Sequence, residues 1–179
     1  MKHIRNRRHL LQAAGSLAAL AGLAPRLGNA VSENRELSFH HLHTGESLRI
    51  AYAERGRYLP EALAAIDHLL RDFRTGEVHA IDPRLLDILH QVATRVGSSG
   101  TYDIISGYRS PTTNASLRRK SEGVALRSMH LVGQAVDVRL RDTRTAEVRR
   151  AALALRAGGV GYYADSDFVH LDTGRVRSW

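Results

Sequence analysis

The chain has 179 residues, of which 43% are hydrophobic and 25% are charged, with ten histidines and no cysteine. This length fits one domain with a sizeable core, and the lack of cysteine excludes disulfide bonds and thiolate metal ligands. Residues 1–30 carry five of the 26 Lys and Arg residues and none of the 18 Asp and Glu residues. The rest of the chain therefore has a net charge of only +3, which argues weakly for nucleic acid and remains compatible with an anionic cell-wall polymer.

The first thirty residues predict an export signal. A basic start is followed by an apolar run from Leu10 to Ala24 and by small residues up to Ala30, which is the arrangement of a signal peptide. The pair Arg7-Arg8 fits a twin-arginine signal; an ordinary signal and an uncleaved membrane anchor are the alternatives. No later stretch has the roughly 20 apolar residues that span a bilayer. We therefore expect residues 31–179 to form one periplasmic domain without stable membrane insertion.

The N-terminal half of this domain predicts two strands followed by two helices. Short strands are expected at residues 37–39 and 48–52, where apolar and β-branched side chains flank a turn. Apolar side chains at helical spacing predict a helix from Pro60 to near Gly76. Asp82-Pro83 then supplies a natural N-cap and first position for a second helix, which Gly97 ends.

The C-terminal half predicts an alternation of strands with one helix. Its expected elements are a strand at 102–106, a loop at 107–111, a strand at 134–140, a helix from Thr145 to Ala157, and strands at 158–163 and 168–172. The polar region 112–127 is interpreted mainly as a surface loop bordering a cleft, with a short helix as the alternative. Together these elements predict an α+β domain whose helices pack against a small, mainly antiparallel sheet.

Three residues in this half have the chemistry of a metal site. His130 comes just before the strand at 134–140, and Asp137 lies on the face of that strand opposite its apolar side chains. A buried carboxylate needs a partner, and a divalent metal is one such partner. His170 lies on the last expected strand, within reach of the other two in space. Two imidazoles and one carboxylate form a catalytic type of zinc site with a fourth position open to water.

The motifs around these residues resemble a known family. They are Ser-Gly-Tyr-Arg-Ser at 106–110, Ser-x-His-x-x-Gly-x-Ala-x-Asp at 128–137 and Asp-x-x-His at 167–170. In this order they resemble the M15 group of zinc D,D- and L,D-peptidases of peptidoglycan, which shares a metal core with Hedgehog signalling domains. Residues 42–46 and 159–174 are similar to its YcbK-like subfamily. The resemblance implies a Hedgehog/D-Ala-D-Ala peptidase-like fold.

The resemblance also implies roles for individual residues. His130, Asp137 and His170 would ligate Zn²⁺, and Asp167 would be the general base, at a position where many relatives have Glu. Residues three apart on a regular strand face opposite sides, so Asp167 can approach the metal only from the turn before the strand. Asp172 shares a face with His170 and is the competing candidate, either as the base or as a hydrogen-bond partner of that ligand.

Other polar residues complete the expected site. Arg109 fits a clamp for the developing oxyanion or for a carboxylate of the peptide stem, because its guanidinium is permanently charged and bidentate. Ser110 and Ser128 are candidate hydrogen-bonding groups for substrate. The basic segment 118–120 has two readings, contact with anionic glycan or stem-peptide carboxylates and a solvated charged loop.

The resemblance implies a zinc-dependent murein peptidase, and the subfamily likeness favours an endopeptidase that cuts peptide cross-links of peptidoglycan during cell-wall remodelling. An L,D- or D,D-carboxypeptidase of the same group and a non-catalytic zinc-containing wall-binding module are the alternatives. A nucleic-acid-binding protein is a further rival, and we expect no nucleic-acid partner.

Two other features receive structural interpretations. His40, His41 and His43 are expected to be structural, because adjacent imidazoles on a strand face opposite sides and cannot readily chelate one ion. Trp179 and the residues before it are expected to pack or pair locally, without a chemical role.

Overall fold

A computed structural model of the chain describes residues 34–121 and 123–179. These residues belong to one compact unit, Val31–Trp179. The signal peptide predicted for residues 1–30 lies outside the described part of the chain. Among the described residues, no helix combines the length and the apolar character needed to cross a membrane.

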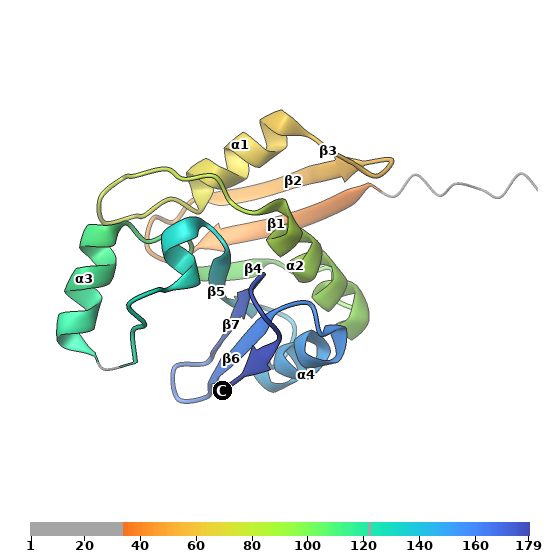
Figure 1. The fold of residues 1–179 in the computed structure, drawn as a ribbon. Coiled ribbons are helices and arrows are strands. Elements are labelled where there is room, and N and C mark those ends of the chain that lie inside the picture. Colours follow the sequence, from red (N-terminus) through yellow and green to blue (C-terminus); the bar gives the residue numbers. More distant parts are fainter. Residues whose placement is uncertain (1–33, 122) are drawn as a thin grey trace, which may run out of the picture. The chain divides into compact units, whose positions relative to one another are not determined.

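The described residues form one eight-stranded sheet. Its strands are β1 (Arg35–His41), β2 (Ser47–Glu54), β3 (Arg57–Tyr58), β4 (Tyr102–Ser106), β5 (Ala135–Leu140), β6 (Gly159–Tyr163), β7 (Phe168–Asp172) and β8 (Arg177–Ser178). They lie in the order β3-β2-β1-β4-β5-β7-β6-β8 (Figure 1). The pairs β1–β4 and β6–β8 are parallel and the other neighbouring pairs are antiparallel.

Four α-helices and one short 3₁₀-helix accompany this sheet in the described part. They are α1 (Pro60–Leu69), α2 (Pro83–Val96), α3 (Pro111–Lys120), η1 (Met129–Val132) and α4 (Thr145–Leu155). Helix α1 packs along β2, and α2 and α4 pack against each other, whereas α3 stands apart from the other α-helices (Figure 1). The predicted α+β class is confirmed. The sheet is larger than expected, because the two-residue strands β3 and β8 extend its edges. It also contains more parallel pairing than expected, because β4 runs parallel to β1 and β8 runs parallel to β6.

The core lies on the apolar face of the central strands. In β5, Val136 and Val138 point into it, and Val169 and Leu171 of β7 do the same. Buried leucines of α2 cover this face. The alternation of a strand then places Asp137 on the opposite face, so the apolar core fixes the direction in which the polar residues of β5 and β7 point.

Helix α1 ends at Leu69, earlier than predicted. The carboxylate of Asp72 explains the early end, because it accepts hydrogen bonds from the backbone N–H of Arg74 at 3.0 Å and of Ser110 at 2.9 Å. An Asp that bonds nearby backbone groups offers the chain an alternative to continued helix. The segment after Leu69 is therefore a loop tied to the start of α3.

Residues 112–127 were expected to be mainly a surface loop, with a short helix as the alternative, and the structure shows the helix α3 in their first part. Ser110 is the N-cap of this helix, since its hydroxyl accepts a hydrogen bond from the backbone N–H of Thr113 at 3.2 Å, and Pro111 takes the first helical position. Both are standard start signals. The polar composition concealed them, because the hydrophobic stripe that marks most helices is weak here.

Candidate metal centre

His130, Asp137 and His170 converge in the structure. Nε2 of His130 lies 3.2 Å from Oδ1 of Asp137 and 3.2 Å from Nδ1 of His170, and this Nδ1 lies 2.9 Å from the same carboxylate oxygen. All three residues are buried. Their ligand atoms lie close enough together to share one metal ion, and among residues 34–121 and 123–179 this is the group of His, Asp or Glu side chains that meets this condition.

Sheet register brings two of these residues together. Asp137 of β5 pairs directly with His170 of β7, and side chains at directly opposed antiparallel positions lie on the same face about 5 Å apart. His130 comes from η1, which Ser128 caps and Gly133 ends with a φ of 64°. A Cβ on Gly133 would lie 2.1 Å from the backbone oxygen of Ala80. A glycine is therefore required for the turn that brings His130 to β5.

Hydrogen bonds on the outer side fix both imidazoles. Nδ1 of His130 lies 2.7 Å from the backbone oxygen of Gly107, and Nε2 of His170 lies 2.9 Å from Oδ2 of Asp172. Each of these nitrogens must be the N–H donor, because its partner is an acceptor. When both rings are neutral, Nε2 of His130 and Nδ1 of His170 therefore carry no proton, and they point at each other and at Asp137. This is how metal-binding histidines are oriented in proteins.

Arg109 binds Oδ2, the second carboxylate oxygen of Asp137. Its Nη2 donates a short, charge-assisted hydrogen bond to Oδ2 of Asp137, and its Nε donates to Oγ of Ser106 at 2.8 Å. With Oδ2 held in this way, Oδ1 is the oxygen that faces the two imidazoles. The guanidinium therefore orients Asp137 for binding through one oxygen.

The pKa values of the cluster follow from burial and mutual charge. Burial lowers the pKa of His130 and so favours the neutral imidazole, which is the form that ligates metals. Burial opposes ionisation of Asp137, but His130 and His170 outweigh it and hold the pKa of this carboxyl well below its usual range. Burial also opposes a charge on His170, yet hydrogen bonds to Asp137 and Asp172 raise its pKa. The cluster thus favours a cation at its centre, either a proton or a metal ion.

The donor set fits zinc. Two imidazole nitrogens and one carboxylate oxygen are the ligands of a catalytic zinc site, and such sites leave a position open for water or substrate. The three groups line a cleft of about 460 Å³. Its other lining residues include Arg109, Arg127, Ser128, Tyr163, Phe168 and Trp179. A metal held by this cluster would be accessible to a substrate in the cleft.

Comparison with known proteins gives the family. The family described as peptidoglycan L,D-endopeptidase MepK matches residues 29–179. The chain belongs to this family. It is 42% identical over 177 residues to the peptidoglycan L,D-endopeptidase MepK of Escherichia coli (strain K12), covering 97% of both chains. It is also 42% identical over 146 residues to the probable peptidoglycan L,D-endopeptidase MepK of Haemophilus influenzae, covering 81% of this chain and 78% of the other. No solved structure matches the chain.

The predicted resemblance to the M15 group is thus confirmed, and the structure separates the two carboxylates proposed as its base. Asp167 has a φ of 50° in the turn before β7, and its side chain is 59% exposed. Its oxygens accept hydrogen bonds from Thr145 at 2.8 Å and from Arg139 at 3.3 Å. These residues line a separate pocket. The structure therefore does not bring Asp167 to the group of His130, Asp137 and His170, called the metal cluster below.

Asp172 is buried beside His170, but its oxygens are already engaged. Besides Nε2 of His170, they accept hydrogen bonds from both Nη atoms of Arg177, at 3.0 and 2.7 Å, and from the backbone N–H groups of Gly159 and Gly174. Burial would raise the pKa of this carboxyl, but its bonds to His170 and Arg177 hold it well below its usual range. Asp172 thus matches the hydrogen-bond partner of a metal ligand, the second of the two roles considered for it.

The two serines differ in position. Ser128 lines the cleft and accepts a hydrogen bond from the backbone N–H of His130 at 3.4 Å. Ser110 is fully buried as the cap of α3 and is not among the residues that line the cleft. The histidines of the first strand and its turn also lie elsewhere: His41 is buried, and His43 stacks on Phe73 with ring centroids 4.0 Å apart.

Sequence reasoning missed the aromatic side of the cleft. Tyr163, Phe168 and Trp179 line it together with the metal cluster. Trp179 was expected only to pack locally, because a residue at the chain end shows no periodicity. The one available signal was composition, since Trp179 is the single tryptophan of the chain.

Proposed function

We propose that this protein is a zinc-dependent peptidoglycan L,D-endopeptidase in which His130, Asp137 and His170 ligate the metal. The observation that carries the proposal is the intact convergence of these three buried donors in a chain of the MepK family. The Escherichia coli relative is named a peptidoglycan L,D-endopeptidase, which favours this bond over a D,D bond. The cleft beside the cluster supplies room for a peptide substrate.

The chain's own residues prepare the site for hydrolysis of a peptide bond. A bound zinc ion supplies a Lewis acid that polarises the scissile carbonyl and lowers the pKa of its water to about 7. Gly107 and Asp172 hold the two imidazoles in the ligating tautomers. Arg109 keeps Asp137 oriented and leaves a positive charge at the edge of the cleft, where it stabilises negative charge that develops on the carbonyl oxygen.

Neither Asp167 nor Asp172, the two candidate general bases, offers a free carboxylate in the cleft. Among residues 34–121 and 123–179, the carboxylate that lines the cleft is that of Asp137, which Arg109 and the two histidines already engage. We therefore propose that Asp172 acts by holding His170, and that Asp167 has no catalytic role.

The cellular setting follows from the same function. We propose that residues 1–30 are a twin-arginine type of signal peptide and that residues 31–179 act in the periplasm on peptidoglycan. A substrate in the cell wall requires export, and the basic and apolar pattern of residues 1–30 supports it. We also propose that the domain has the Hedgehog/D-Ala-D-Ala peptidase-like fold, since an α+β architecture presents the metal cluster on its sheet.

Digestion of purified sacculi with the zinc-loaded protein, followed by mass spectrometry of the muropeptides, tests the proposal. We expect cross-linked dimers joined through an L,D bond to become monomers, and His130→Ala to leave them intact. Loss of only the terminal residue from stem peptides would instead indicate a carboxypeptidase. Zinc binding without any change in the muropeptides would indicate a wall-binding module.

A further inference from the structure

We propose that Trp179, the last residue of the chain, is a substrate-binding residue that forms an aromatic wall of the cleft with Tyr163 and Phe168. The proposal rests on the function proposed above, because the occupant assigned to this wall is the peptide stem of a muropeptide whose scissile bond lies at the metal cluster. A site of this kind combines an apolar surface with a few convergent polar groups.

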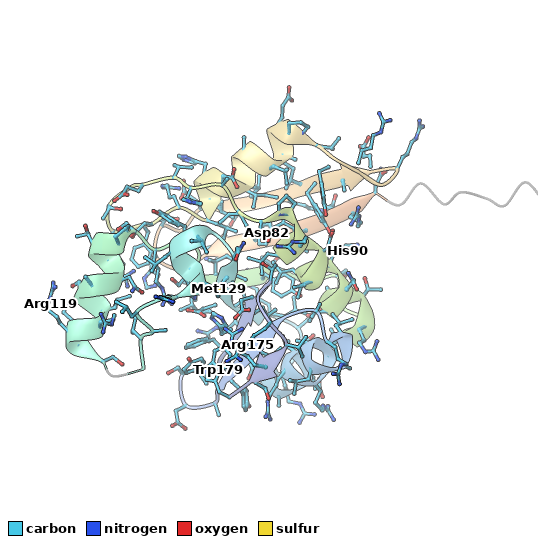
Figure 2. All side chains as sticks on the ribbon, viewed as in Figure 1. Asp82, His90, Arg119, Met129, Arg175 and Trp179 are labelled. Carbon is cyan, nitrogen blue, oxygen red and sulfur yellow. The ribbon has the colours of Figure 1, made fainter. Side chains whose placement is uncertain are left out.

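Trp179 lies directly beside a proposed metal ligand. Its ring centroid is 5.2 Å from that of His170, with 49° between the ring planes. The residue lines the cleft while 49% of its surface remains exposed. Figure 2 labels Trp179 at the end of the chain, near the loop that carries Arg175. A large aromatic side chain left half exposed next to a reaction centre is available for contact with a substrate.

Several contacts hold the indole in this position. The backbone oxygen of Trp179 accepts a hydrogen bond from Tyr162 N–H at 3.0 Å, and its own N–H donates to the backbone oxygen of Val160 at 3.3 Å. The indole Nε1 donates to the Tyr163 hydroxyl at 3.0 Å. The guanidinium of Arg177 lies 4.9 Å from the ring centroid. These contacts hold the indole as a fixed wall of the cleft.

The strand beneath the indole makes room for it. Gly161 of β6 pairs with His170 of β7, so a side chain at Gly161 would stand beside the metal ligand. A Cβ there would lie 2.7 Å from carbon atoms of the Trp179 ring. The glycine therefore lets the indole occupy the position next to His170 that a side chain of β6 would otherwise fill.

The wall continues away from the metal cluster. Tyr163 and Phe168 pair across β6 and β7, and their rings stack with centroids 4.5 Å apart. Both line the same cleft as Trp179. Three adjoining aromatic residues give a surface suited to methyl groups and aliphatic side chains of a peptide stem. The polar groups of the stem would then remain free for the metal cluster and Arg109.

Steady-state cleavage of a purified cross-linked muropeptide, with zinc-loaded full-length protein, separates this role from a purely structural one. We expect Trp179→Ala to raise KM about tenfold, a typical cost of removing an aromatic contact, and Trp179→Phe to restore most of the loss. The matched control is Val176→Ala, an exposed residue of the same segment, which should keep the wild-type KM. Zinc content should match the wild type in all three variants.

The same tryptophan reports binding directly. Trp179 is the single tryptophan in the chain, so titration with the monomeric muropeptide product should change the intrinsic fluorescence of the wild-type protein. If the wild type cleaves the muropeptide but Trp179→Ala has an unchanged KM, Trp179 is not a substrate-binding residue. Unaltered fluorescence of the wild type at saturating product would also refute the role. A drop in kcat and zinc affinity at constant KM would also overturn it. A wild-type protein that cuts no muropeptide would overturn the proposed function itself and the occupant assigned here.

Discussion

Asp172 accepts a hydrogen bond from Nε2 of His170 at 2.9 Å, two residues away on the same strand, and it is held in turn by Arg177. This bond fixes the tautomer in which Nδ1 of His170 faces the metal cluster. Hydrogen-bond partners of metal-binding histidines typically contribute 10- to 100-fold to metal affinity.

Asp172→Asn should therefore weaken zinc binding by about 10- to 100-fold, because an amide is a poorer partner for the imidazole N–H and leaves the charge of Arg177 uncompensated. Competition with a chelator of known affinity measures the change. Asp165→Asn is the matched control, since Asp165 is exposed in the turn between β6 and β7. Equal zinc affinity in Asp172→Asn and the wild type would rule out this role.

Asp167→Ala should leave kcat/KM for a cross-linked muropeptide within about twofold of the wild type. Its exposed carboxylate pairs with Thr145 and Arg139, away from the cluster, and exposed substitutions of this kind usually change energies by no more than about 0.5 kcal/mol. A loss of activity of a hundredfold or more with zinc retained would instead identify Asp167 as the base.

Arg109→Lys should lower kcat/KM by at least about tenfold, although the charge is kept. The guanidinium donates to Ser106 through Nε and to Asp137 through Nη2, and an ammonium group cannot reproduce this two-point geometry. Kinetic assays of Arg109→Lys and Ser106→Ala at saturating zinc separate the two contacts. Wild-type kinetics in Arg109→Lys would show that only the charge matters.

His41 should make folding stability depend on pH. It is fully buried and its Nδ1 accepts a hydrogen bond from the backbone of His43 at 3.2 Å. Burial, and then the neighbouring His43, lower the pKa of His41 to about 4. Well above the ordinary histidine pKa of about 6.5, His41 is neutral in the folded and in the unfolded chain. Between there and pH 4 the unfolded chain binds a proton that the folded chain does not, so the unfolding free energy falls as the pH falls.

Denaturant titrations at pH 7 and pH 4.5 measure this effect. After allowance for solvent screening, we expect His41 to account for about 1 to 2 kcal/mol of the decrease. His41→Asn keeps a short polar side chain that does not titrate, so its decrease should be smaller than that of the wild type by this amount. The same decrease in both proteins would refute the assignment.

Much of the fold and the convergence of His130, Asp137 and His170 could be predicted from the sequence. The alternation around Asp137 predicted the face on which it lies, and the short strand at His170 predicted an imidazole within reach of it. The antiparallel pairing of β5 with β7 brings these two residues directly opposite each other. Asp82-Pro83 and Gly97 predicted the bounds of α2 because caps are local chemistry. The family motifs then predicted the group to which the chain belongs.

The remaining features depend on contacts between distant parts of the chain. Asp72 ends α1 early because it bonds Ser110, a partner 38 residues away. The position of Asp167 depends on the turn before β7 and on Thr145, which sequence spacing does not reveal. Trp179 reaches the cleft only because β8 pairs with β6 in parallel. Local patterns carry no information about such pairings.

The most direct test of the metal centre is the zinc stoichiometry of the purified protein, measured by elemental analysis after equilibrium dialysis against buffered zinc. We predict one zinc per chain for the wild type and strongly reduced occupancy in His130→Ala, Asp137→Asn and His170→Ala. Chelation should abolish muropeptide cleavage, and added zinc should restore it. Full zinc occupancy in all three variants, or unchanged cleavage by the metal-free wild type, would contradict the account.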